Sequence, residues 1–459
     1  MSFNYFQKTP LYKAFSELGR RIFLPEGIFY WAGRAKEEAE LNGTIGAAFG
    51  FENDFIEGGS NKWVPCYLKE ISEYSNLTID EIVPYTSIGG LHQTREYWKK
   101  WIVKKSLYDE NAQKDLLNRL EKYITIPVIT TGVTNGLFNS CSLFLNPGEF
   151  IIAPNKRWGN YDNIIKKYIN ANIKPFEFFK GKNLNLDGIK EAINQVSEIQ
   201  EKIVIILNFP NNPTGYVPTK EEGKKLVNLL RESQKFYNKP IIVIVDDAYE
   251  PYTYTNDTIK TSIFYDLHQL EEEVIPIKLD GITKELLLYG GRIGFITFGL
   301  KPHWTANEIE LENLKKEINN KLEGFTRATI SNCNSFYQVL TQKLFTEKGT
   351  TQIINSRDKV KLLLRDRFER INQELNQINN PSISIDPNSG GFFVFMNLNP
   401  SKIKATEFAD YLLKKYKVGI IPIEKPDENV NGIRIAYCSI NLSAIPELIK
   451  RINSALQDL

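Results

Sequence analysis

One strand–helix–strand segment constrains the fold more than any other part of the chain. It opens with the β-branched run KIVIILNFP (202–210), passes through the turn NNPTG, and reaches a capping box at Thr219 that begins an amphipathic helix extending to about Tyr237. The apolar run PIIVIVDDAY (240–249) follows at once. A helix between two short strands is the crossover of a parallel pair, so we expect a parallel sheet covered by helices.

Further apolar runs extend this pattern on both sides. Strands are expected within residues 123–132, 149–154, 274–279 and 294–299, and the helix after the first of them should stop at Asn146-Pro147-Gly148. The larger part of the chain is therefore expected to be an α/β domain.

The C-terminal part has a different organisation. Residues 350–379 read as one long helix, with apolar residues at helical spacing and charged residues between them. Short strands and a helix near 405–416 follow, which indicates a compact α+β unit. Because 459 residues exceed what one core usually organises, we expect three parts: 1–60 as an N-terminal arm and part of a small domain, 61–350 as the large domain, and 351–459 as the rest of the small domain.

The composition narrows the partners and the compartment. Charged residues make up 24% of the chain and the net charge is +2, so no field of one sign would recruit nucleic acid or an anionic membrane. The four cysteines lie far apart and there are only three histidines, which argues against a disulfide scaffold and against a metal site. No apolar run is long enough to span a membrane. We expect small-molecule partners and a cytoplasmic location.

Polar residues stand where the expected strands end, which is where ligands bind in such sheets. The first strand leads into a helix whose free N–H groups, on Gly132, Val133 and Thr134, suit a phosphate. Another strand ends in a turn that holds Asn212, and the next ends in Asp246, a carboxylate that should be buried and in need of a cation. Each site taken alone could also be an ordinary turn or helix cap.

Two cations complete this set. The segment DGITKELLLYGGRIG (280–294), too glycine-rich for a helix, places Lys284 eight residues before Arg292. A phosphorylated pyridine aldehyde needs dipoles and an arginine for its phosphate, a carboxylate for its ring nitrogen, hydrogen bonds for its phenolic oxygen and an amine for its aldehyde. The strand-end groups and the two cations meet all of these needs, so pyridoxal 5'-phosphate is the expected cofactor.

The motifs NFPNNPTG, DDAY and GITKELLLYGGRIG, in this order, make the chain resemble the fold type I aminotransferases of class I/II over nearly its whole length. The segments RWGNY (157–161) and VPYTSIGGL (83–91) are most similar to the aspartate and aromatic aminotransferase branch. The resemblance implies a large domain with a mostly parallel sheet of the seven-stranded type, a smaller α+β domain built from both chain ends, and a homodimer with shared active sites.

The resemblance also implies a role for each matched residue. Lys284 would hold the cofactor as a Schiff base and then shuttle the substrate proton, while Asp246 would pair with the ring nitrogen. Asn212 and Tyr249 would contact the phenolic oxygen. The other matched residues would contact the ring or the phosphate: Trp158 by stacking, and Gly132, Val133, Thr134, Arg292 and Tyr85 of the partner subunit at the phosphate.

Two positions depart from the family pattern. The family usually places a serine three residues before the lysine, where it helps to hold the phosphate, and this chain has Gly281 there. A histidine often supports the aspartate at the ring nitrogen, and this chain has Tyr161 instead. The phenol of Tyr161 could still hydrogen-bond Asp246.

The resemblance extends to the substrate site. Arg434 in NGIRIAYCSI matches the arginine that binds the α-carboxylate, and the alternative is an exposed arginine on an edge strand. Thr44 and Gly46 match the segment that lines the substrate entrance. Arg327 in GFTRATISN matches an arginine that reaches from the partner subunit to the side-chain carboxylate of dicarboxylic substrates, and the alternative is an ordinary helix-surface arginine.

The expected reaction is the transfer of an amino group between an α-amino acid, dicarboxylic or also aromatic, and a 2-oxo acid. A lyase, decarboxylase or synthase that uses the same cofactor would share every residue named, because the bond that breaks depends on how the substrate is oriented about Cα. A regulator that binds the cofactor without catalysis would need roughly 60–70 further N-terminal residues for a helix-turn-helix. The aminotransferase-like region begins by about residue 25, which disfavours that third reading.

Overall fold

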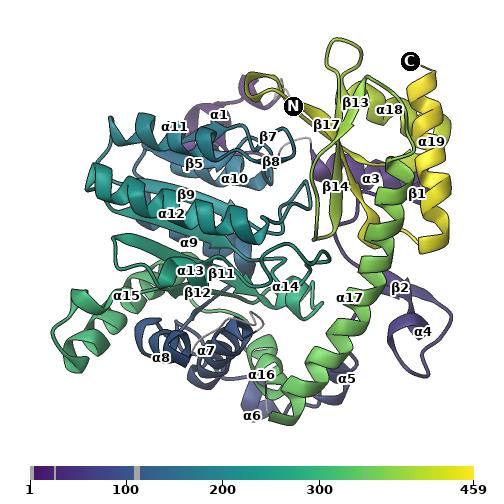
Figure 1. Cartoon of the computed structure of the whole chain (residues 1–459). Coiled ribbons are helices and arrows are strands. Elements are labelled where there is room, and N and C mark those ends of the chain that lie inside the picture. The colour runs from purple at the N-terminus through teal and green to yellow at the C-terminus, as the bar shows by residue number, and fades with distance from the viewer. Residues whose placement is uncertain (1–4, 25–26, 108–113, 346, 459) are drawn as a thin grey trace.

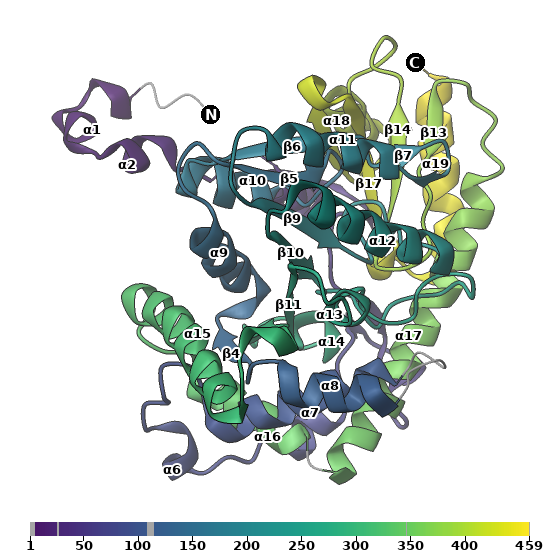
Figure 2. The same cartoon turned by 60° about the vertical axis from the view of Figure 1, so that its left-hand side comes forward.

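The computed structural model describes residues 5–24, 27–107, 114–345 and 347–458. At its centre lies a seven-stranded sheet in the order β4-β12-β11-β10-β9-β5-β6 (Figures 1 and 2). Its strands are β4 Val128–Thr130, β5 Phe150–Pro154, β6 Asn172–Phe176, β9 Ile203–Asn208, β10 Ile241–Asp246, β11 Val274–Gly281 and β12 Gly294–Phe298. Only β12 runs against the others. The expected mostly parallel sheet is therefore confirmed.

The central crossover forms as its sequence predicts. Helix α12, Lys220–Tyr237, begins after Thr219, whose side chain accepts from the Glu222 N–H while the Glu222 carboxylate accepts from the Thr219 N–H. Strands β9 and β10 are buried along their whole length and pair in register, so that Asp246 lies beside Asn208. The polar residues that end these strands therefore meet at one edge of the sheet.

Two cores cover the two faces of this sheet, because successive strand residues point to opposite sides. Ile203 and Ile205 pack in a core with α7, His92–Ser106, whereas Val204 and Ile206 pack in a core with α9, Gly132–Phe144. Further elements of the large half are α8 Lys114–Tyr123, α10 Asn160–Asp162, the π-helix Asn163–Ile169, α11 Leu186–Ser197, α13 Phe264–His268, α15 Glu308–Thr329, α16 Ser335–Leu344 and the hairpin of β7 Phe179–Lys180 with β8 Asn183–Leu184.

A second, antiparallel sheet in the order β13-β14-β17-β16 forms the smaller half (Figure 1). Its strands are β13 Ile383–Ile385, β14 Phe393–Leu398, β16 Ile421–Lys425 and β17 Val430–Ala436, and α18 Ala405–Tyr416 and α19 Ile445–Gln457 pack in the same core. The chain enters this half through α17, Glu347–Leu375.

The N-terminal region also contributes to the smaller half. Helix α3, Ile28–Glu38, contacts α18, and β1, Leu41–Asn42, pairs with β15, Val418–Gly419. Residues 28–42 and the C-terminal part of the chain therefore meet there, whereas α1 and α2 project away from the smaller half (Figure 2). The exact boundaries at residues 60 and 350 stay a prediction. Other short elements include α1 Pro10–Ala14, α2 Glu17–Arg21, α4 Glu52–Phe55, α5 Glu70–Glu73, α6 Ile79–Ile82 and the hairpin of β2 Phe49–Phe51 with β3 Trp63–Pro65.

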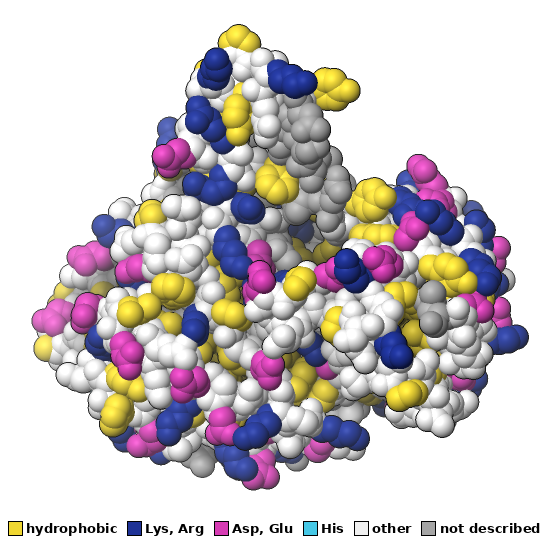
Figure 3. Space-filling model, turned by 90° about the horizontal axis from the view of Figure 1, so that it is seen from above, with side chains coloured by type: hydrophobic (Ala, Val, Ile, Leu, Met, Phe, Trp, Pro, Cys, Tyr) yellow, Lys and Arg dark blue, Asp and Glu magenta, His cyan; other side chains and the backbone are white. Residues whose placement is uncertain are grey.

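The surface fits the near-neutral charge of the chain. On the face shown in Figure 3, Lys and Arg side chains are mixed with Asp and Glu side chains, except on the upper projection, where Lys and Arg predominate. Within the described ranges, every helix is too short or too polar to cross a bilayer.

Candidate active site

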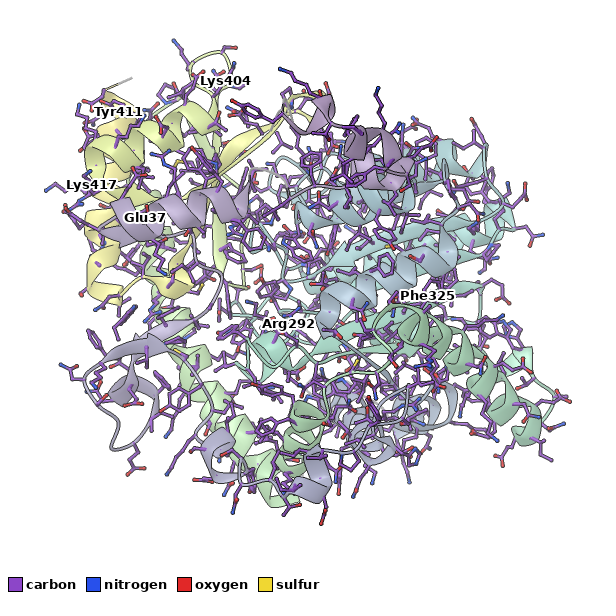
Figure 4. The ribbon with its side chains drawn as sticks, turned by 180° about the vertical axis from the view of Figure 1, so that it is seen from behind. Glu37, Arg292, Phe325, Lys404, Tyr411 and Lys417 are labelled. Atoms are coloured by element: carbon purple, nitrogen blue, oxygen red, sulfur yellow. The ribbon has the colours of Figure 1, made fainter. Side chains whose placement is uncertain are left out.

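A cavity of about 260 Å³ lies at the strand-end edge of the large sheet and reaches the smaller half. Arg292, one of its residues, lies near the centre of the molecule, where the two halves meet (Figure 4). Its wall is formed by Ile28, Thr44, Gly46, Val133, Thr134, Trp158, Asn208, Asn212, Asp246, Ala248, Tyr249, Gly281, Thr283, Lys284, Arg292, Phe393 and Arg434. Most of the site residues expected from the sequence are therefore brought together in one cavity, and their individual roles stay predictions.

Lys284 lies on a single helical turn, α14, Ile282–Glu285. Our expectation that this stretch is too glycine-rich for a helix is wrong, because Gly290 and Gly291 follow the turn and leave residues 282–285 free to form it. The Lys284 ammonium donates to the carbonyl of Gly46. Burial lowers the pKa of Lys284 to about 8, and the positive charges of Arg434 and Arg292 add to this effect. A neutral amine is thus accessible near neutral pH.

Asp246 ends β10 with its carboxylate buried. Burial raises its pKa to about 6, and hydrogen bonds from the Tyr161 hydroxyl and from the Ala248 N–H, at 3.2 Å, oppose that rise. The expected contact of Tyr161 with Asp246 is confirmed. Among the described residues no Lys or Arg forms an ion pair with Asp246, so a cationic ring nitrogen in the cavity would supply the missing partner.

An anion cradle forms where α9 begins. Gly132 has φ +74°, and a Cβ atom on it would lie 2.4 Å from Nη2 of Arg292, so only glycine lets the guanidinium lie against this turn. The N–H groups of Val133 and Thr134 follow at the positive end of the helix dipole. Together with Arg292 they provide the donor set that a phosphate requires.

The structure explains why the usual serine is absent. A Cβ atom on Gly281 would lie 2.6 Å from the carbonyl oxygen of Ile293 and 2.9 Å from Cα of Gly294. Gly294 in turn packs against the Gly132–Val133 peptide, because a Cβ atom added to Gly294 would lie 2.5 Å from the carbonyl carbon of Gly132. Close backbone contact at this corner therefore excludes a side chain at residue 281.

Arg434 lies on β17, which pairs with β14 on one side and β16 on the other. It is 3% exposed, so the alternative of an exposed arginine on an edge strand is wrong. One terminal nitrogen donates to Oδ1 of Asn212 at 3.2 Å and the other to the carbonyl of Thr44 at 3.0 Å, and the guanidinium lies 4.3 Å from the ring centroid of Phe393. Its Nε has no partner among the described residues.

Two further aromatic residues line the cavity. Tyr249 is buried, which raises the pKa of its hydroxyl, and Asn212 hydrogen-bonds that hydroxyl. The ring of Trp158 meets the ring of Tyr161 edge-on at 5.8 Å. Sequence reasoning missed Asn208, which the strand-end argument could have identified, and also Ile28, Ala248, Thr283 and Phe393, whose apolar or turn context carries no such signal.

Three expected site residues are not part of the cavity wall: Gly132, which lies beside Val133 and against Arg292, and the more distant Tyr85 and Arg327. Tyr85 is 94% exposed. Arg327 is exposed on α15, the helix that carries Phe325 (Figure 4), and donates a hydrogen bond to Oγ of Ser331 at 2.5 Å. Their segments are joined, because Asn332 donates to the carbonyl of Thr86 at 3.0 Å. The resemblance assigns both residues to the active site of a partner subunit, and those assignments stay predictions.

Known proteins of similar sequence are named as aminotransferases. The chain is 24% identical over 396 residues to an aspartate aminotransferase of Pyrococcus horikoshii, covering 85% of this chain and 87% of the relative. It is 23% identical over 351 residues to a probable aspartate/prephenate aminotransferase of Aquifex aeolicus, covering 74% and 78%.

Solved structures share the fold. An aminotransferase of Anaerococcus prevotii superposes with a TM-score of 0.78 at 21% identity, covering 96% of this chain and 98% of that one. A kynurenine aminotransferase of Pyrococcus horikoshii superposes with a TM-score of 0.76 at 18% identity, covering 98% of each chain. The family model for aminotransferase class I and II matches residues 106–452. The chain therefore belongs to the class I and II aminotransferases, enzymes that use pyridoxal phosphate.

Proposed function

We propose that this aminotransferase moves the amino group of a dicarboxylic α-amino acid, glutamate or aspartate, to a 2-oxo acid, and that aromatic amino acids also enter the site. Arg434 is the observation that carries the assignment of an α-amino acid as substrate. Its buried guanidinium, with Nε unpartnered among the described residues, lines the cavity that also holds Lys284. A carboxylate is the ligand that best completes such a group, so the α-carboxylate of an amino acid would bind there.

Pyridoxal phosphate fits the remaining polar groups of the cavity. When bound, it draws electrons from the substrate Cα into its protonated ring. Asp246 would hold the ring nitrogen in its protonated form, and Arg292 with the first N–H groups of α9 would bind the phosphate. Asn212 and Tyr249 would hydrogen-bond the phenolic oxygen.

Lys284 would act as the base. Its Nζ, whose pKa is lowered by burial, would take the proton from the substrate Cα and return it to the cofactor carbon on the other side of the amino nitrogen. Return of the proton at a different atom distinguishes transamination from simple racemisation. Release of a 2-oxo acid from the amino donor, without loss of carbon dioxide or of a side-chain fragment, separates this reaction from decarboxylation and lyase chemistry.

The dicarboxylic substrate class rests on Arg327. Within the described part of this subunit, the cationic residues of the cavity are Lys284, Arg292 and Arg434, each with a role above. A distal carboxylate therefore needs a cation from elsewhere, and Arg327 of the partner subunit is the candidate that the family resemblance supplies. The relatives named aspartate aminotransferase support the same class, and the kynurenine aminotransferase supports aromatic substrates.

Replacement of Arg327 tests this substrate class. We expect Arg327→Ala to lower kcat/KM for glutamate and aspartate by about 2–4 kcal/mol of transition-state binding, because a desolvated carboxylate would lose its partner, and to spare monocarboxylic substrates. Lys316→Ala, at another exposed position of α15, is the control. Equal losses on glutamate and on phenylalanine would show that Arg327 does not recognise the distal carboxylate.

The same proposal includes a homodimer in the cytoplasm. Tyr85 and Arg327 can serve a cavity only in another subunit, since both are exposed and outside the cavity of their own chain. Four free, buried cysteines are compatible with a reducing compartment. A fully active monomer in sedimentation experiments would contradict the shared site.

A further inference from the structure

A cluster of buried charges lies on the α7 face of the large sheet, outside the cavity. We call it the α7 ion cluster; its members are Lys105, Asp247, Glu250, Lys278, Asp280 and Glu285, and their side chains are 0–5% exposed. None of them lines the cavity, and none has a role in the chemistry described above.

The Lys105 ammonium holds three carboxylates together. Its Nζ lies 2.6 Å from Oε2 of Glu250, 3.0 Å from Oε2 of Glu285 and 3.2 Å from Oδ2 of Asp280. The carboxylate oxygens of these three residues lie within 4.8 Å of one another, a spacing that would otherwise suit a metal ion. The ammonium therefore occupies the place of a cation and neutralises part of their repulsion.

The other charged groups of the cluster also have close hydrogen-bond partners. Lys278 donates to Asp247 and, at 2.9 Å, to Oε2 of Glu250, which joins the two lysines through one carboxylate. The indole N–H of Trp98 donates to Asp280 at 2.8 Å, and that of Trp101 donates to Glu285 at 2.6 Å. Both tryptophans and Lys105 come from α7, so one helix fixes two acidic residues of the β11–α14 segment.

Stability alone does not account for such a cluster. Burying so many charged side chains costs desolvation free energy that their mutual attraction only partly offsets, and apolar residues of similar size often do as well or better. Buried ionic groups do, however, accept only a narrow set of geometries, because any displaced member is left unpaired in an apolar surrounding.

The cluster is attached to the two catalytic side chains. Asp247 follows Asp246, and because successive residues point to opposite sides, one carboxylate enters the cavity while the other joins the cluster. Glu285 follows Lys284 on the single turn of α14. Glu285 thus holds the segment that carries Lys284, the proposed base. Asp247 likewise holds the segment that carries Asp246, the carboxylate proposed for the ring nitrogen.

We propose that Lys105 is a positioning residue, which sets Lys284 in the cavity by holding Glu250, Asp280 and Glu285 behind it. This inference rests on the proposed role of Lys284 as the base. Without the ammonium, Glu250 keeps Lys278, but the nearest cation to Asp280 is then Lys278 at 3.9 Å and the nearest to Glu285 is Arg357 at 3.6 Å. The three buried carboxylates then repel one another more strongly, and the α14 turn moves with Glu285. A shift of about 1 Å in a catalytic group can slow a reaction about 10²-fold.

Arg434, proposed to bind the substrate α-carboxylate, should not be affected by the loss of Lys105. Arg434 belongs to the smaller sheet and is held by Thr44 and Asn212, none of which contacts the α7 ion cluster. Loss of Lys105 should therefore slow proton removal from Cα and leave substrate binding intact.

Single-turnover kinetics of the holoenzyme test this role. Lys105→Met, purified with pyridoxal phosphate, is mixed with L-glutamate, or with the amino acid that the wild type converts fastest if glutamate is not a substrate. We expect the rate of conversion per cofactor-loaded site to fall about 10²-fold, with substrate affinity changed by less than about twofold. Lys104→Met, the exposed neighbour on α7, is the matched control and should keep the wild-type rate. Failure of the wild type on glutamate counts against the substrate class alone.

A second variant keeps the test decisive if Lys105→Met does not fold. Glu285→Gln preserves shape and the acceptor for Trp101 while removing the ion pair with Lys105 and the longer one, at 3.6 Å, with Arg357. We expect at least about a tenfold fall in the same single-turnover rate. A purely structural cluster would lower the melting temperature or the loaded fraction and leave the rate per loaded site unchanged. A wild-type rate in Glu285→Gln, or in folded Lys105→Met, would overturn the proposal.

Discussion

Tyr161 stands where the family often has a histidine, and its hydroxyl hydrogen bond to Asp246 has a measurable consequence. Tyr161→Phe removes that bond and keeps the ring that packs edge-on against Trp158. In the wild type the pKa of Asp246 is about 6, with burial raising it and the Tyr161 hydrogen bond lowering it. Loss of the bond must therefore move this pKa upward.

The size of the shift follows from the strength of the bond. A hydrogen bond to a charged acceptor contributes about 1.5–3 kcal/mol, and one pKa unit corresponds to about 1.36 kcal/mol, so the pKa of Asp246 in the variant should be about 7–8. The cofactor ring nitrogen pairs with the ionised carboxylate of Asp246. Cofactor binding therefore weakens as the protonated fraction of Asp246 rises. At pH 6 about half of Asp246 is ionised in the wild type and about a tenth to a hundredth in the variant.

Cofactor titrations of the two apoproteins across pH measure this difference. We expect Tyr161→Phe to bind pyridoxal phosphate about 5–50-fold more weakly than the wild type at pH 6 and about equally at pH 9, where both carboxylates are ionised. Ionisations of the cofactor itself cancel in the ratio. Tyr168→Phe, in the neighbouring π-helix, is the control. A ratio of affinities that stays constant from pH 6 to pH 9 would refute the reasoning.

Two further changes test the site from other directions. Lys284→Ala should abolish transamination yet still bind pyridoxal phosphate, because the phosphate and ring contacts remain, and borohydride treatment of the wild type should attach the cofactor to Lys284; attachment to another lysine would contradict the assignment. Gly281→Ser restores the residue usual in the family, but its Cβ would lie 2.6 Å from the carbonyl of Ile293, so we expect a loss of about 1–3 kcal/mol in unfolding free energy without tighter cofactor binding. An unchanged melting temperature would mean that this corner relaxes more easily than its packing suggests.

Much of the fold followed from local pattern. Helix α12 begins after Thr219 and ends at Tyr237, as its capping box and apolar spacing predict, because both signals act within a few residues. The short turn around Lys284 did not follow, since one helical turn has no periodicity to detect and depends on the contacts made by Leu286 and Ile282 in the core.

Residue type and order in the chain determined the chemistry of the site: a lysine, an aspartate and an arginine at the ends of expected strands define which cofactor could bind there. Only the tertiary structure decided the environment of each group. Arg434 proved to lie on an interior strand and to donate to Asn212, 222 positions away, which no spacing in the sequence encodes.

The α7 ion cluster shows the same limit most clearly. In the sequence, Lys104 and Lys105 are adjacent lysines in KWIVKKS (100–106), and residue type does not distinguish them. Lys104 is exposed, whereas Lys105 is buried among carboxylates that come from 145 to 180 positions further along the chain. The charge of a side chain is a property of its residue type, but whether that charge meets water or three carboxylates is decided by the packing of distant segments, because burial is a property of the whole fold.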